Sequence, residues 1–289
     1  MTTLFWGDIN FPSSRAVDDY EDESEEEKEI QFTVDMNSHH QNIFKSIHAK
    51  RFIFAIGSNA IAFTKAYILQ KFKHEKIGSL SMHVKHFKED KNNTNNTFVG
   101  RDCFLYHINE GYSTIICHFD SNLNTEFQQD FVKYMFGLLG QNTPPLFIIL
   151  TNVHISNLKI DKIPIPNPPC LRFLKTDVNE KDEKKFNCIP YLEQPNIISG
   201  MPASIMTYCQ IHKLTGYLYL VYSETFITDI VTVNAFLSVL NTQELKDFIT
   251  INGENIKTQK HGTELVKIWN TKETRTYFRN ILGDSSGFQ

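Results

Sequence analysis

The turn near residue 57 is the first place where the sequence could bind a ligand. The segment "AIGSNAIAF" follows a predicted strand and opens a predicted helix, which leaves the backbone N–H groups of Ser58 and Asn59 free to bind an anion. It lacks the GxGxxG and GxxxxGK[ST] patterns that bring a backbone close to phosphate groups. An ordinary strand-to-helix turn is therefore the favoured interpretation, and a phosphate site is the alternative.

Two cysteines could form a metal site or a disulfide across a predicted hairpin. If Ile108 pairs with Tyr112, Cys103 lies opposite Cys117 on the neighbouring strand. His118 would then point to the other face, and a second histidine would lie about two pairs away along the strand, so four ligands would not converge. We expect buried, reduced thiols at these positions.

Cys209 and His212 are spaced to share one face of a predicted helix, and such a pair can act as nucleophile and base. The cysteine stands among apolar residues in mid-helix, where burial disfavours a thiolate. No GxSxG, HExxH or kinase signature occurs in the chain. The sequence therefore predicts no catalytic residue, no metal site and no cofactor.

The elements around these residues predict an α/β fold. Apolar runs that are rich in aromatic and β-branched residues alternate with segments of helical periodicity. Two of the runs, 145–153 and 216–223, are unbroken, which is typical of central strands covered on both faces. We expect a single domain with a mixed, largely buried central sheet flanked by helices. Further strands are predicted at 50–57, 101–108 and 113–119, and helices at 58–72, 124–140 and 200–212.

Three charged, amide-rich or proline-rich stretches should be surface loops, namely 88–97, 163–169 and 179–185. Beyond residue 230 the pattern predicts three successive helices, at 232–240, 242–249 and 262–278. Asn241 and Glu244 have the spacing of a capping box that would open the second of these helices.

The segment Asp18–Glu29 contains nine acidic residues and one lysine, a net charge of −8 in a chain whose total is −4. Such a run repels itself and buries nothing. We therefore expect residues 1–40 to form an acidic, largely disordered extension, 41–280 the α/β domain, and 281–289 a flexible tail.

The compartment and the partner class follow from composition. No stretch approaches the ~18 apolar residues of a membrane span, and the N-terminus lacks a secretory signal. The five cysteines show no CxxC spacing, which favours reduced thiols and a cytoplasmic location. The basic residues are scattered, so nucleic acid is not an expected partner.

Several longer stretches resemble the proteasome assembly chaperone 1 family. They are "RFIFAIGSNAIAF", "YLEQPNIISGMPASIMTYCQ", "GYLYLVYSETFITDIVTVNAFLSVL", and the opening "LFWGDINFPSSRAV" followed by the acidic run. The resemblance is strongest over 190–240 and thin across the loops and 242–289. It implies a non-catalytic chaperone domain similar to nucleoside phosphorylase-like folds, without their active site.

The resemblance also implies partners. Such a protein would pair with proteasome assembly chaperone 2 and bind the outer face of the 20S proteasome α-ring through the α subunits. The segment from Gln194 to Pro202 would then build the fold or a partner interface rather than a ligand pocket. The alternatives are a phosphorylase-like enzyme and a generic acidic-tailed binding protein.

The last three residues, Gly287, Phe288 and Gln289, depart from the family pattern. Members of this group often end in a hydrophobic residue, a tyrosine and any residue, which together enter a pocket between α subunits. Here the penultimate ring and the terminal carboxylate remain, but the hydrophobic side chain and the hydroxyl are missing. We expect these residues to be a weak anchor to the α-ring.

Overall fold

In the computed structural model, residues 28–35, 47–86, 95–98, 103–109, 113–119, 127–139, 146–159, 166–176, 189–225 and 227–248 are described. Their strands are β1 (Lys28–Asp35), β2 (Arg51–Ile56), β3 (His74–His86), β4 (Asn95–Phe98), β5 (Cys103–Ile108), β6 (Thr114–Phe119), β7 (Phe147–His154), β8 (Cys170–Lys175) and β9 (Gly216–Ser223). The α-helices are α2 (Ser58–Thr64), α3 (Gln128–Leu139), α4 (Gly200–Ile211) and α5 (Ile230–Ala235). Shorter turns of π- or 3-10 helix are η2 (Lys65–Leu69), η4 (Ile155–Asn157), η6 (Phe236–Asn241) and η7 (Lys246–Phe248).

The strands form one mixed sheet, in the order β1-β3-β5-β6-β2-β7-β9-β8, with β4 also paired to β3. The four central strands β6, β2, β7 and β9 run parallel to one another. The outer strands join antiparallel to their neighbours. This arrangement confirms the predicted α/β domain with a mixed sheet.

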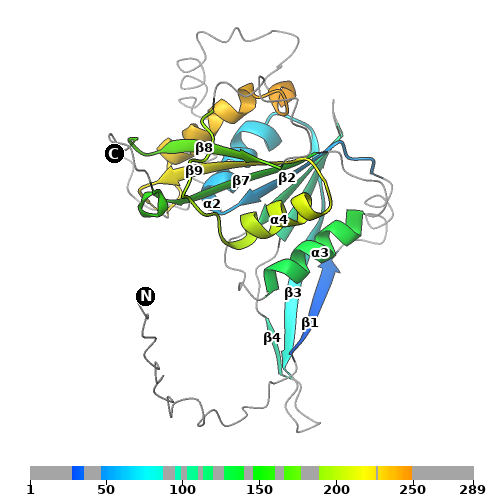
Figure 1. Cartoon of the computed structure of the whole chain (residues 1–289). Coiled ribbons are helices and arrows are strands. Elements are labelled where there is room, and N and C mark those ends of the chain that lie inside the picture. Colours follow the sequence, from blue (N-terminus) through cyan, green and yellow to red (C-terminus); the bar gives the residue numbers. More distant parts are fainter. Residues whose placement is uncertain are drawn as a thin grey trace, which may run out of the picture.

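Side-chain alternation along the central strands builds a core on each face of the sheet. In β2, Phe52 and Phe54 join the core on one face, whereas Ile53 and Ala55 join the core on the other. Helices α3 and α4 cover the first face, and α2 with the α5 to η7 segment covers the second (Figure 1). Because both faces of the sheet are covered, consecutive residues of the central strands are buried and apolar, as predicted.

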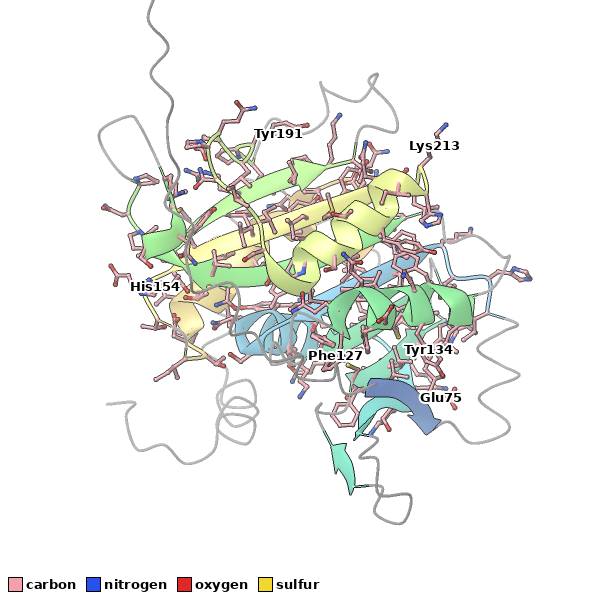
Figure 2. The ribbon with its side chains drawn as sticks, turned by 60° about the horizontal axis from the view of Figure 1, so that its bottom comes forward. Glu75, Phe127, Tyr134, His154, Tyr191 and Lys213 are labelled. Carbon is pink, nitrogen blue, oxygen red and sulfur yellow. The ribbon has the colours of Figure 1, made fainter. Side chains whose placement is uncertain are left out.

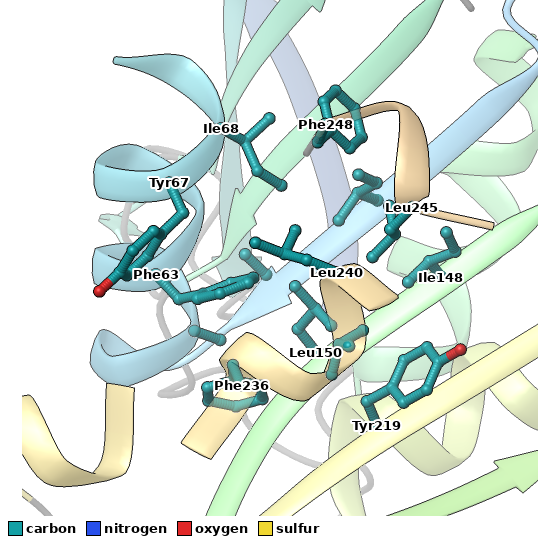
Figure 3. Close-up of a cluster of buried hydrophobic side chains, with 14 of the residues drawn as sticks. Phe63, Tyr67, Ile68, Ile148, Leu150, Tyr219, Phe236, Leu240, Leu245 and Phe248 are labelled. Carbon is teal, nitrogen blue, oxygen red and sulfur yellow. The ribbon is translucent and has the colours of Figure 1, made fainter. Parts of the chain in front are cut away.

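Aromatic rings tie the helices of the second face together. The ring of Phe63 lies 5.4 Å from the ring of Tyr67 and 5.4 Å from that of Phe236, measured between centroids. Figure 3 shows Phe63 and Tyr67 on the helical segment formed by α2 and η2, with Phe236 on the neighbouring segment. Rings packed in this way remove much apolar area from water and so stabilise the layer.

Two strands lie where the sequence led us to expect none. β1 falls within residues 1–40, which we assigned to the acidic extension, and β4 overlaps the end of the expected loop 88–97. Both strands pair with the long strand β3. Backbone hydrogen bonding to β3 therefore overrides the polar composition of these stretches.

The predicted helix at 242–249 and its capping box are wrong. Asn241 is the last residue of η6, and Glu244 lies in the turn before η7. The guanidinium of Arg51 instead donates hydrogen bonds to the carbonyl of Glu244 and to the carboxylate of Asp247, and so fixes this segment against the start of β2. The predicted helix at 262–278 and the loop at 179–185 lie outside the described residues.

Candidate functional site

Ligands of open α/β sheets bind at the carboxyl ends of the parallel strands, which here are the ends of β2, β7 and β9. Gly57 follows β2 and has φ 86°, and a Cβ added there would be in ordinary van der Waals contact with Oδ1 of Asn152, at 3.4 Å. The positive φ, rather than a lack of space, therefore favours glycine at this turn.

Asn59 holds this turn against the segment that follows β9. Its side chain is fully buried, and its Oδ1 accepts a 3.0 Å hydrogen bond from the backbone N–H of Asp229. Asp229 in turn caps α5 by accepting a 2.7 Å bond from the N–H of Thr232. The predicted site at Ser58 and Asn59 thus contains a structural link, which supports the ordinary turn.

Two further polar links join the loops along the same edge. The Nε2–H of His154 donates to the carbonyl of Glu224 over 2.9 Å, while its Nδ1 accepts from the N–H of Ser156. The side chain of Asn196 bonds to the N–H and the carbonyl of Lys159, at 2.7 and 2.9 Å. The loops after β7 and β9 and the segment before α4 are therefore held together.

Exposed aliphatic side chains lie in the loop after β9, in the first turn of α5 and in the segment before α4. Ile227 is 78% exposed and Val231 is 58% exposed, and Ile230 stands beside them. Ile197, next to the Asn196 link, is 81% exposed. Single exposed aliphatics are ordinary, but several on one edge are typical of a protein interaction surface. We call these four residues the carboxyl-edge surface.

Sequence reasoning missed this surface. The stretch "ETFITDIV" continues the apolar composition of β9 beyond the strand, and that continuation is the signal that was available. Composition alone did not distinguish exposed isoleucines from buried ones.

The segment before α4 closes the outer edge of the sheet at β8. The N–H of Phe173 donates to the carbonyl of Pro190 over 2.9 Å, and the N–H of Leu192 donates to the carbonyl of Phe173 over 2.8 Å. The ring of Tyr191, labelled in Figure 2, packs edge-on against that of Phe173. The middle of β8 is therefore paired by its own chain.

An ion pair fixes this closure. The Nε–H of the buried Arg172 lies 2.9 and 2.8 Å from the two carboxylate oxygens of Glu193. Burial raises the pKa of the Glu193 carboxyl, but the hydrogen bonds from Arg172, a backbone hydrogen bond and the charge of Arg172 together outweigh it and lower that pKa. The segment that opens at Tyr191 thus builds the fold at its start and exposes Ile197 further on.

Cys209 and His212 do not form a nucleophile and base. Cys209 is fully buried in α4, and burial raises the pKa of its thiol to about 12. His212 lies exposed at the end of the helix, where its ring stacks on that of Tyr208 at 4.1 Å. The thiol is therefore protonated at neutral pH, as the mid-helix position predicted.

The predicted facing pair of Cys103 and Cys117 is wrong. Ile108 pairs with Thr114, so Cys117 lies opposite Leu105. The connection between the strands is two residues longer than we expected, which shifts the register but keeps each residue on its face. Both thiols are free and buried, as predicted. Within the described part of the chain, no cluster of His, Cys, Asp or Glu is suited to hold a metal ion.

His118 lies on the other face from Cys117, as predicted, and is nearly fully buried. The hydroxyl of Thr64 donates to backbone carbonyls of its own helix, so its oxygen accepts from Nε2–H of His118 over 2.8 Å. Burial, with smaller contributions from the charges of Lys65 and His74, lowers the pKa of His118 to about 3. The ring is neutral at physiological pH.

Gly287, Phe288 and Gln289 lie outside the described residues. The described chain ends at Phe248, whose ring lies 4.8 Å from the guanidinium of Arg51. Arg51 begins β2, so residue 248 stands at the amino ends of the parallel strands, opposite the carboxyl-edge surface.

No helix in the described ranges is long and apolar enough to span a membrane.

Comparison with known proteins gives concordant matches. A family model described as Proteasome assembly chaperone 4 matches residues 1–276. The chain is 30% identical over 230 residues to Proteasome assembly chaperone 1 of Homo sapiens, covering 78% of this chain and 74% of that protein. It is 25% identical over 264 residues to Proteasome assembly chaperone 1 of Xenopus laevis, covering 83% and 89%.

Two solved structures share the fold. Pyrococcus furiosus PbaB, an archaeal proteasome activator, superposes with a TM-score of 0.54 at 15% identity and covers 88% of this chain and 98% of its own. The monoclinic form of PbaA from the same organism, an archaeal homolog of proteasome-assembly chaperone, gives 0.50 at 13% identity and covers 86% and 92%.

Proposed function

This chain belongs to the proteasome assembly chaperone 1 family, and on that premise we propose that it is a non-catalytic chaperone for assembly of the 20S proteasome α-ring. It acts as a heterodimer with proteasome assembly chaperone 2 and binds proteasome α subunits in the cytoplasm. It needs no cofactor. The likeness to nucleoside phosphorylase-like folds stays a prediction.

The carboxyl-edge surface is the observation that carries this proposal. A chaperone that holds subunits before they assemble needs apolar groups that remain accessible in the free protein. Ile197, Ile227 and Val231 are such groups, and the polar links through Asn59, His154 and Asn196 hold their loops in place. A preformed surface of this kind loses little conformational entropy on binding.

The chemistry of the described residues supports a binding role. The Cys209 thiol is protonated, and the polar side chains of the carboxyl edge are engaged with backbone groups of neighbouring loops. These bonds stabilise loops and leave few groups for acid, base or nucleophile roles.

The C-terminal residues Gly287, Phe288 and Gln289 form a secondary anchor in this proposal. Burying the Phe288 ring contributes roughly 1.5–3 kcal/mol, while ordering a glycine- and serine-rich tail costs about 1–2 kcal/mol per residue. These contributions nearly cancel, so the folded domain supplies most of the affinity for the α-ring.

Co-expression with a tagged proteasome assembly chaperone 2 tests the proposal. We expect a one-to-one complex that also retains proteasome α subunits, with a partner interface near the standard size of about 1,600 Å². Recovery of this chain without any α subunit would overturn the proposed function.

A matched pair of variants tests the surface. The double variant Ile227→Ser with Val231→Ser should reduce recovery of a partner or of α subunits by at least about tenfold. Ile211→Ser is the control, because Ile211 is 69% exposed but lies at the end of α4 that leads into the amino end of β9. Equal losses in the two cases would remove the carboxyl-edge surface from the proposal.

A further inference from the structure

Strand β1 forms the open edge of the sheet. It is the terminal strand of the sheet order, and all eight of its residues pair antiparallel with β3. Within the part of the chain that the structure describes, no segment pairs with its other side. In an edge strand, alternate residues direct their N–H and C=O groups away from the sheet, where they require other partners.

β1, β4 and the second part of β3 form an arm of the sheet. This arm extends beyond the part of the sheet that the helices cover, which we call the covered body. β3 is 13 residues long, but β5 pairs only with its first part, from His74 to Leu80. Its second part pairs with β1 on one side and with β4 on the other. Figure 1 shows these three strands projecting past α3, away from the remaining helices.

The opposite edge of the same sheet is treated differently. There the chain pairs its own residues 190–192 with Phe173 in the middle of β8. Proteins commonly close or blunt an edge strand because an unpaired edge binds other strands. One edge is closed by the chain itself, and the other presents a row of about 26 Å of backbone groups.

Charge selects the kind of strand that the open edge accepts. The acidic run Asp18–Glu29, with its net charge of −8, includes the first two residues of β1, Lys28 and Glu29. A field of that sign attracts a segment rich in lysine or arginine and disfavours an acidic one. It also opposes the approach of a second copy of this chain, which carries the same run.

We propose that the outer edge of β1 binds an extended, basic segment of a partner protein by β-strand addition. Backbone hydrogen bonds to β1 supply the affinity, and the acidic run supplies the selectivity. The inference goes beyond the proposed function, and its test uses no proteasome component, so its failure would leave that function untouched.

Amide hydrogen exchange of the full chain tests the inference directly. The probe is an eight-residue peptide that alternates lysine with threonine and valine, and its control carries glutamate in place of lysine. In the free chain, alternate amides of residues 28–35 should exchange fast. The lysine peptide should slow those amides by about tenfold or more, and the glutamate peptide should bind at least about tenfold more weakly.

Two adjacent proline variants, Gln31→Pro and Phe32→Pro, separate binding from folding. Because N–H directions alternate, one of them removes an outward N–H and the other removes a bond to β3. The free chain's exchange pattern identifies the outward position. That variant should keep its melting temperature yet lose protection by the lysine peptide.

Three results would overturn the inference. They are the absence of new protection at millimolar lysine peptide, equal protection by the two peptides, and protection that rises with protein concentration alone. The last result would assign the edge to a second copy of this chain.

Discussion

The two edges of the sheet have the same kind of strand but different surroundings. At β8, residues 190–193 supply backbone hydrogen bonds, an aromatic contact and the Arg172–Glu193 ion pair. At β1, the described chain supplies pairing on the β3 side alone. The β8 edge is stabilised by the chain itself, whereas the β1 edge is the one proposed to bind a basic segment of a partner. The closed side should respond to substitution through unfolding, and the open side through binding.

The largest loss of stability is expected from a substitution in the core on the second face of the sheet. Phe236→Ala removes a fully buried ring that packs on Phe63 and should lower the free energy of unfolding by about 3–5 kcal/mol. Denaturant unfolding measures this change. Ile227→Ala is the control, because its side chain is exposed and should change stability by less than about 0.5 kcal/mol. Similar losses in the two variants would contradict the assignment of Phe236 to the core and of Ile227 to the surface.

A lower pH should destabilise the folded chain through His118, which lies in the central strand β6. Its pKa of about 3 in the folded chain lies below the ordinary value of 6.5, so the unfolded chain binds more protons between these values. The free energy of unfolding should therefore fall as the pH drops below about 6.5, by roughly 1 kcal/mol per pH unit. Comparison with His118→Asn isolates this contribution. An identical pH slope in the variant would refute the assignment.

Arg172→Ala should open the closed edge at a moderate cost. Loss of the bonds to Glu193, whose side chain is partly exposed, should lower stability by about 1–2 kcal/mol. The amides of Phe173 and Leu192 should then exchange faster. Glu193→Gln, which keeps one acceptor oxygen, should have a smaller effect. Unchanged exchange in Arg172→Ala would mean that the ion pair does not maintain the closure.

The covered body could be predicted from the sequence, whereas the arm could not. Apolar runs such as 216–223 identify central strands because two buried faces require them. β1 was hidden beside the acidic run, although Ile30, Phe32 and Val34 alternate within it, and β4 is four polar-rich residues long. β1 and β4 are strands because they pair with β3, and the pattern of a single sequence does not show which segments pair.

The sequence shows that the residues of the carboxyl-edge surface are apolar, but it does not show that they are exposed. Ile227 and Val231 look like core residues in the sequence, and the tertiary path of the loop after β9 turns them outward. The hairpin register failed for a similar reason, because loop length between β5 and β6 sets it.

The C-terminal residues Gly287, Phe288 and Gln289 should contribute modestly to binding. Deletion of Phe288 and Gln289 should weaken binding of the heterodimer to α-ring intermediates by no more than about tenfold, or ~1.4 kcal/mol. Gly287→Leu with Phe288→Tyr should strengthen it by restoring the apolar side chain and the hydroxyl. Complete loss of binding on deletion would make the tail the main anchor.

The smallest effect on stability is expected from the acidic run. Removal of residues 1–27 leaves β1 whole and should not change the melting temperature, because a polyacidic segment buries no core. The same deletion should reduce binding of the lysine peptide at β1. A drop of several degrees would show that the run contributes to the fold.

Assembly of α-rings from purified subunits measures the proposed function directly. Purified α subunits would be mixed with the heterodimer of this chain and proteasome assembly chaperone 2, and the ring intermediates would be counted by native mass spectrometry. We expect more complete α-rings and fewer aberrant α-subunit dimers than without the heterodimer, and a smaller gain with Ile227→Ser and Val231→Ser. An identical distribution of intermediates with and without the heterodimer would contradict the proposed function.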